Sequence, residues 1–294
     1  MNKITIDGFT LTAQQVMAVA RAPHLPVVLA DSSRAALKES RDYIEATWMH
    51  DEAPMMYSFN TGVGLLKDTR IKVEHIELFQ TQMIKAHCAG MGEPFSEEVS
   101  RATMLLRANA FASNYSAPRV EVVDRLLAFL NAGIHPIMPQ KGSVGASGDL
   151  APLSYLAAAI AGFDEAEVMY EGQRMSAPQA ITKAGIGPVQ FDLKAKDASA
   201  LINGCTASLA VAVLVAHDAR NDHPRRAARQ FRRPRQLRRH VLRFHAQPAA
   251  LDRPGLDDVV HDLARDLDRR RKANAHRPAG FRINGGVDAH QVAV

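Results

Sequence analysis

The chain has 294 residues, of which 47% are hydrophobic, enough to bury a core in one large or two medium domains. No apolar run reaches the length of a membrane span, and the first residues lack the pattern of a signal peptide. The two cysteines, Cys88 and Cys205, have no metal-site spacing, which is typical of a cytoplasmic protein.

The net charge of +5 hides an asymmetry along the chain. From Asn221 onward there are 17 Lys and Arg residues against 8 Asp and no Glu, whereas residues 1–220 are mildly acidic. The excess positive charge therefore belongs to the last part of the chain alone. We expect neither a membrane nor a nucleic acid as partner.

Helical patterns dominate the first half. Alternation of Ile4 and Ile6 with polar residues predicts a short strand, and Thr12 is a good cap for the helix that follows. A second helix is predicted to begin at residue 33, with Asp31 or Ser32 as its cap. Apolar spacing then predicts helices at 13–22, 33–48, 72–87, 96–110 and 120–132, the last closed by Gly133.

Residues 134–208 are predicted to combine helices with an extended stretch and a hairpin. Residues 134–139 are expected to be extended, and the apolar run 150–162 indicates a buried helix with Pro152 in its first turn. A small hairpin is predicted at 165–176 and a short helix and turn at 178–187. Asp197 opens a last helix, which we expect to continue through 201–208.

A glycine-rich segment connects the extended stretch to the buried helix. It reads Lys-Gly-Ser-Val-Gly-Ala-Ser-Gly-Asp-Leu-Ala-Pro-Leu over residues 141–153. The spacing excludes a phosphate loop, a dinucleotide fingerprint and a nucleophile elbow. The segment leads into a helix N-terminus, where free N–H groups and the helix dipole favour negative charge.

The triplet Ala146-Ser147-Gly148 can form a ring by itself. The amide nitrogen of Gly148 can attack the carbonyl carbon of Ala146, and loss of two waters, one of which takes the Ser147 hydroxyl, leaves a methylidene-imidazolone. The segment resembles the cofactor-forming segment of the aromatic amino acid ammonia-lyases, histidine ammonia-lyase especially. The resemblance implies the cofactor 4-methylidene-imidazol-5-one (MIO), no external cofactor and no metal. An ordinary loop is the simpler alternative.

Tyr57 begins the sequence Tyr-Ser-Phe-Asn-Thr-Gly-Val-Gly. This is similar to the Tyr-Gly-Ile-Asn-Thr-Gly-Phe-Gly loop of the lyases, in which the tyrosine is the catalytic base. It departs at Ser58, Phe59 and Val63 without losing a functional group. The resemblance implies the base role for Tyr57. Because a phenol is ordinarily protonated at neutral pH, we expect the site to stabilise the phenolate, for example through helix dipoles.

His87 lies at the predicted end of a helix and is followed by Cys-Ala-Gly-Met-Gly-Glu-Pro. The segment resembles the His-Ala-Ala-Gly-Val-Gly-Glu-Pro of histidine ammonia-lyases, whose histidine contacts the substrate ring. The resemblance implies that His87 binds the substrate and favours a polar ring, imidazole or phenol. A dipole partner at the helix end, or a merely exposed side chain, is the structural alternative.

Asn203 lies in Leu-Ile-Asn-Gly-Cys-Thr-Ala-Ser, which resembles the Leu-Leu-Asn-Gly-Thr-Gln-Ala-Ser of the family. The resemblance places it beside the cofactor and the substrate amino group. Asn-Gly inside a helix costs about 1 kcal/mol in propensity, so we expect either a functional reason or a simple kink. Asp149 is expected to support cofactor formation through the helix start on which it sits. We expect Arg107 and Asn109 to be structural.

The resemblance ends near residue 220. Residues 221–294 contain no Ser, Thr, Tyr, Trp, Met, Cys or Glu, a poor composition for a packed core. A nucleic-acid-binding tail and a solvated disordered tail are possible interpretations, but the Arg-rich run lacks interleaved aromatic residues. We favour a change of reading frame, with a stray helix around 257–272.

The resemblance implies a mainly α fold, a truncated N-terminal part of the ammonia-lyase fold of the fumarase/aspartase-like superfamily. Residues 1–220 would hold the MIO-forming loop and the start of the helical bundle. The implied reaction is elimination of ammonia from an aromatic amino acid, with L-histidine giving urocanate as the first expectation. A tyrosine or phenylalanine ammonia-lyase or aminomutase is one alternative, and an inactive fragment is the other. The family forms homotetramers, which we regard as doubtful for this chain.

Overall fold

A computed structural model describes residues 3–22, 25–143 and 147–230, with side chains through residue 219. The chain divides into two compact units, Met1–Leu214 and Val215–Val294. All packing described below lies within the first unit. The predicted domain boundary at residue 220 stays a prediction, and the predicted helix around 257–272 lies outside the described residues.

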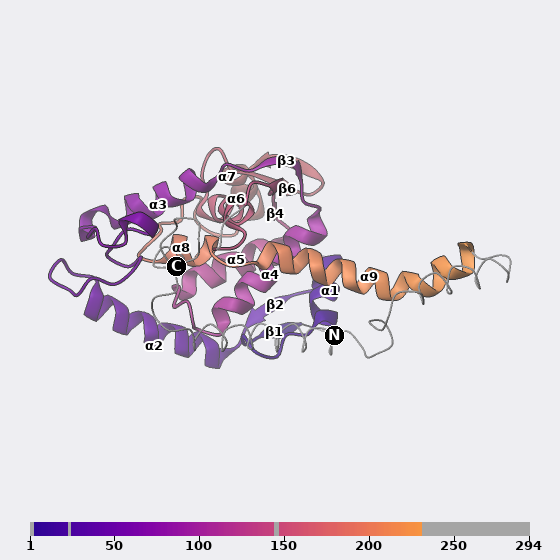
Figure 1. Cartoon of the computed structure of the whole chain (residues 1–294), viewed down its shortest axis with the longest axis horizontal. Coiled ribbons are helices and arrows are strands. Elements are labelled where there is room, and N and C mark those ends of the chain that lie inside the picture. Colours follow the sequence, from indigo (N-terminus) through magenta and orange to yellow (C-terminus); the bar gives the residue numbers. More distant parts are fainter. Residues whose placement is uncertain (1–2, 23–24, 144–146, 231–294) are drawn as a thin grey trace, which may run out of the picture. The chain divides into compact units, whose positions relative to one another are not determined.

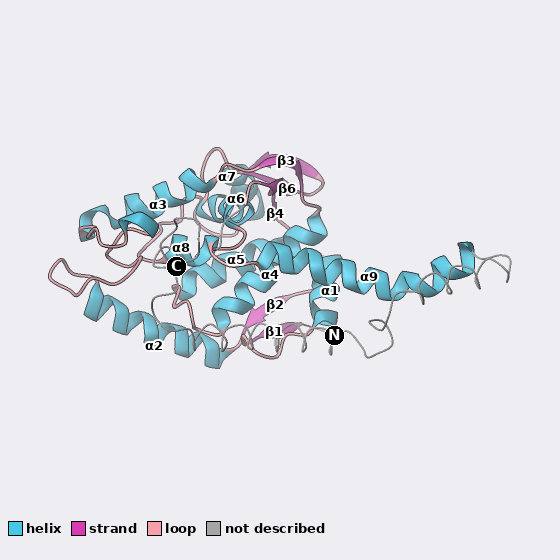
Figure 2. Cartoon of the chain, viewed as in Figure 1, coloured by secondary structure: helices cyan, strands magenta, loops and turns pink. Residues whose placement is uncertain are grey.

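The first unit is mainly helical, as the sequence predicts (Figures 1 and 2). The last helix begins in this unit and continues into the second. The helices are α1 (Ala13–Arg21), α2 (Asp31–Trp48), α3 (Ile76–His87), α4 (Glu97–Ala112), α5 (Val120–Ala132), α6 (Leu150–Ala161), α7 (Ala177–Ala184), α8 (Asp197–Ile202) and α9 (Thr206–Gln230).

Short strands connect and cover the helices. They are β1 (Ile4–Ile6), β2 (Val27–Leu29), β3 (Met91–Pro94), β4 (His135–Pro136), β5 (Pro139–Lys141), β6 (Glu167–Tyr170) and β7 (Gln173–Ser176). β1 pairs with β2 in parallel, β3 pairs with β5 antiparallel, and β4, β6 and β7 form an antiparallel sheet. β6 and β7 are the predicted hairpin, and β4 lies in the stretch 134–139 that the sequence predicts to be extended.

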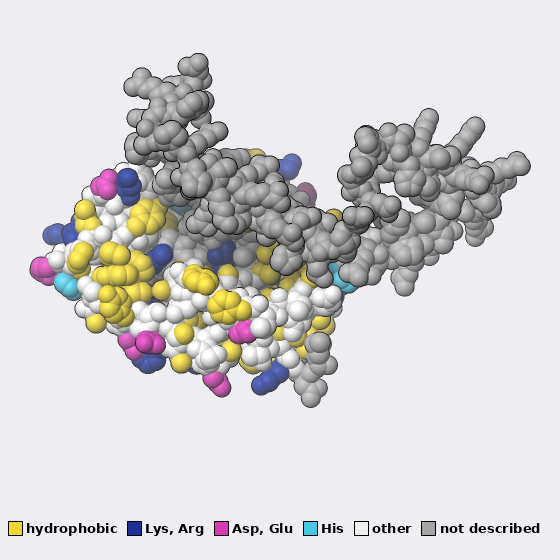
Figure 3. Space-filling view, turned by 60° about the horizontal axis from the view of Figure 1, so that its bottom comes forward, with side chains coloured by type: hydrophobic (Ala, Val, Ile, Leu, Met, Phe, Trp, Pro, Cys, Tyr) yellow, Lys and Arg dark blue, Asp and Glu magenta, His cyan; other side chains and the backbone are white. Residues whose placement is uncertain are grey.

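The core lies where α4, α5 and α6 meet. Leu105, Leu126 and Leu153, one from each helix, are wholly buried. α6 is buried on almost every side, which explains the continuous apolar run of its sequence. Some apolar side chains remain at the surface, and Figure 3 shows such side chains gathered on one face. Leu65 is the extreme case, with 99% of its surface exposed.

Buried arginines join the ends of neighbouring helices. Arg101 of α4 donates hydrogen bonds to the carbonyls of Val19, Ala22 and Leu130, which lie at the C-terminal ends of α1 and α5. Arg125 of α5 donates to the carbonyl of Ile160 at the end of α6 and to the carbonyls of Ile186 and Val189 in the loop after α7. Because the last carbonyls of a helix have no partner within it, each arginine satisfies acceptors that would otherwise be buried alone.

The helix ends test the predicted caps. Thr12 caps α1 with a full capping box, and Gly133 closes α5 in the left-handed conformation, as predicted. The cap of α2 was predicted wrongly. Asp31 is already the first residue of that helix, and Ala30 before it provides no side-chain bond. The carboxylate of Asp31 instead lies in the first turn, where the helix dipole favours it.

Candidate functional site

The backbone on either side of Gly148 is held by Gly204. The N–H of Gly204 donates to the Ser147 carbonyl at 2.8 Å, and the N–H of Asp149 donates to the Gly204 carbonyl, also at 2.8 Å. This is a parallel bridge between positions 148 and 204. In such a bridge the N–H of the middle residue points away from the partner strand. The amide nitrogen of Gly148 is therefore not engaged by Gly204.

Neither glycine of this bridge can carry a side chain. Gly148 has a φ of +99°, and a Cβ on it would lie 2.4 Å from the Gly204 carbonyl oxygen. Gly204 has a φ of +105°, and a Cβ there would lie 2.9 Å from a terminal nitrogen of Arg107. Both positions have a φ that favours glycine, and at Gly148 the close approach of the Gly204 backbone also leaves no room for a Cβ. Ala146, the third residue of the predicted ring, lies outside the described residues.

Asn203 lies in a break between two helices, and the prediction that it lies within one helix is wrong. α8 ends at Ile202, Asn203 is extended with φ −86° and ψ 145°, and α9 begins at Thr206. The Nδ2 of Asn203 donates to the Ser199 carbonyl at 2.8 Å. The propensity cost of Asn-Gly is thus avoided because the helix stops, and Gly204 is freed to bind the 147–149 backbone.

Asp149 contacts a different helix from the one on which it sits. It precedes α6, but its side chain makes no capping bond there. Its carboxylate accepts hydrogen bonds from the N–H and the hydroxyl of Ser208 in α9, at 2.7 and 2.6 Å. The Ser143 hydroxyl caps α6 in its place, accepting from Ala151 at 2.8 Å. Asp149, which is buried, therefore ties the loop to the start of α9.

Tyr57 lies in a loop attached to α8. Its hydroxyl accepts a hydrogen bond from the Gly64 N–H at 3.3 Å, and its side chain is 44% exposed. The buried hydroxyl of the neighbouring Ser58 lies 2.6 Å from that of Ser199. Since the carbonyl of Ser199 also accepts from Asn203, one residue of α8 holds both segments. The structure thus connects Tyr57 to Asn203 through Ser58 and Ser199.

His87 is the last residue of α3. Its Nδ1 lies 2.7 Å from the Met83 carbonyl, so Nδ1 is the donor and Nε2 is left as an acceptor in the neutral ring. The turn after it is held by the Tyr155 hydroxyl of α6, which donates to the carbonyls of Cys88 and Gly90 at 3.2 and 3.3 Å. Burial raises the pKa of the Cys88 thiol to about 11, so this cysteine is a neutral packing group.

The same turn borders the start of the glycine-rich segment. Met91 of β3 pairs with Lys141 of β5, and a Cβ on Gly142 would lie 3.0 Å from the Cα of Gly90. His87 is thereby held at one end of the loop and Asn203 at the other. Within the described residues no hydrogen bond joins the side chains of Tyr57 or His87 to Ser147 or Gly148, so the catalytic role of Tyr57 and the substrate-binding role of His87 stay predictions.

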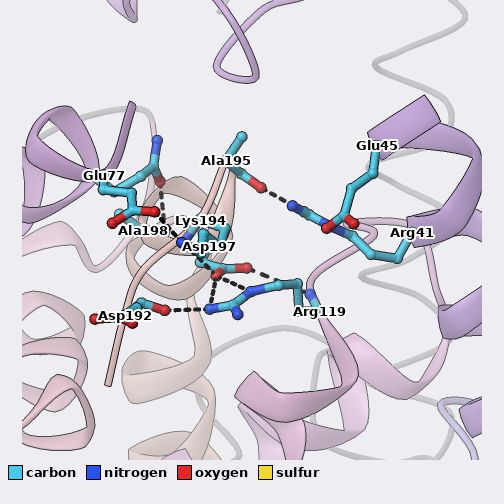
Figure 4. A network of polar contacts seen from close by, with 10 residues as sticks. Arg41, Glu45, Glu77, Arg119, Asp192, Lys194, Ala195, Asp197 and Ala198 are labelled. Carbon is cyan, nitrogen blue, oxygen red and sulfur yellow. Dashed lines mark hydrogen bonds and ion pairs between the residues drawn. The ribbon is translucent and has the colours of Figure 1, made fainter. Parts of the chain in front are cut away.

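A buried charged network anchors α8 (Figure 4). Asp197, the first residue of α8, is completely buried and accepts from Arg119 at 2.7 Å and from the Lys194 N–H at 2.9 Å. Arg41 of α2 donates to the Ala195 carbonyl at 2.6 Å. These residues support the site without belonging to it. Arg119 and Arg41 gave no sequence signal beyond their charge, because their partners lie 78 and 154 residues away.

Two features are absent from the part of the chain that the structure describes. In that part no group of three or more His, Cys, Asp or Glu side chains could hold a metal ion. No helix within the same residues is long and apolar enough to cross a membrane.

Comparison with known proteins decides the family. Residues 11–223 match the family described as aromatic amino acid lyase. The chain belongs to this family. It is 47% identical over 211 residues to histidine ammonia-lyase of Geobacillus thermodenitrificans, covering 72% of this chain and 40% of that protein. The chain thus spans about two fifths of the length of the curated relatives that it matches.

Solved structures of the family have the same fold. The ergothioneine-degrading enzyme ergothionase of Treponema denticola matches with a TM-score of 0.69 and 27% identity, over 74% of this chain and 42% of that one. Tyrosine aminomutase of Streptomyces globisporus matches with a TM-score of 0.67 and 32% identity, over 74% and 39%. The predicted family and mainly α fold are confirmed.

Proposed function

We propose that this chain carries the ammonia-lyase site, in which Ala146, Ser147 and Gly148 form MIO and ammonia is eliminated from an aromatic amino acid, L-histidine by preference. The observation that supports this most is the bridge between Gly148 and Gly204. It fixes the residues on both sides of Gly148 while leaving the Gly148 nitrogen out of the bridge. The close approach of the two glycines also explains why the attacking residue must be glycine.

Ring formation needs no external reactant. The Gly148 nitrogen bonds to the carbonyl carbon of Ala146, and the Ala146 oxygen leaves as water with the two amide protons of Ser147 and Gly148. The Ser147 hydroxyl then leaves as a second water with the Cα proton, which creates the methylidene group. The ring supplies an electrophile that withdraws electrons from the substrate.

The surrounding side chains have distinct proposed roles. Tyr57 removes the β-proton of the substrate, and Asn203 holds the amino group or the ring. The free Nε2 of His87 accepts a hydrogen bond from the N–H of an imidazole, or from the hydroxyl of a phenol. Asp149, bound to Ser208, keeps the ring-forming segment against the start of α9.

The first test is mass spectrometry of the full-length protein after digestion into peptides. We expect the peptide that contains residues 142–150 to be lighter than its sequence by two waters, and the Ser147→Ala variant to keep its full mass. An unmodified wild-type peptide would end the proposal.

The second test identifies the substrate. The protein is incubated separately with L-histidine, L-tyrosine and L-phenylalanine, and the products are identified. We expect urocanate from L-histidine.

A tyrosine- or phenylalanine-specific lyase or aminomutase is the second candidate. The similarity to tyrosine aminomutase favours it, and His87 fits a phenol as well as an imidazole. A β-amino acid product would establish an aminomutase. If the ring forms and none of the three amino acids reacts, the chain is a non-catalytic fragment, consistent with its spanning two fifths of its relatives.

A further inference from the structure

Arg107 lies beneath the break between α8 and α9. It comes from α4 and is only 4% exposed. One terminal nitrogen donates to the carbonyl of Ala200 in α8 at 3.2 Å, and the other to the hydroxyl of Thr206, the first residue of α9, at 2.8 Å. A single guanidinium therefore spans the gap in which Asn203 and Gly204 lie.

The same guanidinium packs against Gly204. A Cβ on Gly204 would lie 2.9 Å from the Arg107 nitrogen that binds Thr206, so the guanidinium and the Gly204 backbone are in close contact. Gly204 in turn holds the carbonyl of Ser147 and the N–H of Asp149. Arg107 is thus separated from the ring-forming segment by one residue.

Arg107 differs from the other buried arginines of the fold. Arg101 and Arg125 each use all three guanidinium nitrogens to bind carbonyls. Arg107 leaves its Nε buried without a hydrogen-bond partner in the described residues. Burial lowers the pKa of Arg107 to about 10 despite the nearby charge of Asp149, so the group is still a cation at neutral pH. A buried cation with an unpaired donor is costly if packing is its only role.

We infer that Arg107 is a positioning residue for ring formation: it holds the α8–α9 break so that Gly204 fixes Ser147 and Asp149 and leaves the Gly148 nitrogen to reach the Ala146 carbonyl. The inference rests on the proposed function. Arg107 touches no reacting atom and acts through Gly204.

The experiment compares full-length Arg107→Met and Arg107→Lys with wild type, and uses Arg125→Met as the matched control. Amide hydrogen exchange is measured on peptides that contain Asp149 and Gly204. In the same samples, the fraction of the 142–150 peptide that has lost two waters is followed over time after synthesis. Arg125 is also a buried arginine that donates hydrogen bonds to main-chain carbonyls, but its partners Ile160, Ile186 and Val189 lie away from Gly204.

In Arg107→Met we expect exchange of the Asp149 and Gly204 amides to be about tenfold faster or more, because charged hydrogen bonds are lost. Water loss should slow together with it. Arg107→Lys should show a smaller effect in both measurements. Arg125→Met should leave the exchange of these two amides, relative to other core amides, and the extent of water loss as in wild type.

Each outcome decides the inference. Unchanged exchange at Asp149 and Gly204 in folded Arg107→Met overturns it, and so does an equal effect of Arg125→Met. If Arg107→Met does not fold, Thr206→Val removes one of the two contacts alone, and wild-type exchange and water loss there overturn the inference. If the wild type itself keeps both waters, the proposed function fails and the role of Arg107 in ring formation fails with it, although faster exchange in Arg107→Met would still show that Arg107 holds the break.

Discussion

Gly148 is a position where a single methyl group has a large predicted effect. In Gly148→Ala the new Cβ would lie 2.4 Å from the Gly204 carbonyl, and the φ of +99° would be strained for alanine. We expect a loss of about 2–4 kcal/mol in the free energy of unfolding, since strain and overlap add. Urea unfolding of the purified variant measures it, and the mass of the 142–150 peptide should show no water loss.

Gly172→Ala is the matched control for this substitution. Gly172 has a φ of +71°, but nothing lies within 4 Å of its Cβ position. The control therefore reports the backbone strain alone, about 1 kcal/mol. Equal losses in the two variants would show that the contact between Gly148 and Gly204 is not tight.

His135 gives the fold a predicted dependence on pH. Burial, with the charge of Arg101, lowers the pKa of this β4 residue from 6.5 to about 4. The unfolded chain therefore binds a proton between these values that the folded chain does not, so stability rises with pH across this window. Replacing His135 by Gln should reduce the loss of stability between pH 7 and pH 5 by about 2 kcal/mol.

Urea unfolding at the two pH values measures this difference. The variant His75→Gln is the control, because His75 lies at the surface. It should keep the pH dependence of the wild type. Parallel curves for wild type and His135→Gln would mean that His135 is not held neutral in the folded protein.

For single residues, the sequence predicts those that the proposed chemistry requires, but not those that hold them in place. Ser147 and Gly148 can be identified because ring closure needs those residue types in that order. Arg107 and Ser199 cannot be identified as supports, since their importance comes from contacts with residues 93 and 141 positions away. A buried arginine gives the same sequence signal whether it satisfies a helix end or supports the glycine-rich loop.

Among the elements, the long amphipathic helices were predicted well and their junctions less well. α1, α4 and α5 begin and end within a few residues of prediction, because apolar spacing and caps are local signals. The break at Asn203 was missed, because the residues on both sides are apolar and helical. Only the bridge to Gly148, made by tertiary contact, explains why the helix stops there.

The hydrogen bonds between Asp149 and Ser208 at the start of α9 are predicted to stabilise the fold. Asp149 caps this helix from outside, so Asp149→Ala should destabilise the fold by about 1–2 kcal/mol through loss of two hydrogen bonds to a buried carboxylate. Ser208→Ala removes only the hydroxyl contact and should cost less. Chemical denaturation of both variants tests the order, and a larger loss for Ser208→Ala would contradict it.

At the scale of the whole molecule, residues 1–214 form one of the two compact units of the chain, with its own buried apolar core. Each described hydrogen bond of the candidate site also falls within this range. We therefore expect residues 1–220, expressed alone, to unfold at the same urea concentration as the full chain. Coincident unfolding curves by circular dichroism would confirm it.

A chain ending at residue 200 is the control for this comparison. It lacks Leu201, Ile202, Ala210 and Leu214, which belong to the core. We expect it to lose cooperative unfolding, because no other described segment can fill their place. A shift of the midpoint for residues 1–220 relative to the full chain would show that the later residues stabilise the first unit.

The link between Asp149 and Ser208 joins residues 59 positions apart in the chain. We expect such a contact to form late in folding, because closing a long loop costs conformational entropy before the contact can stabilise it. Chemistry that depends on this geometry cannot begin on a nascent or isolated loop peptide. Ring closure would then follow the formation of this contact, so the rate at which the modified peptide appears would measure how fast the start of α9 packs against the loop.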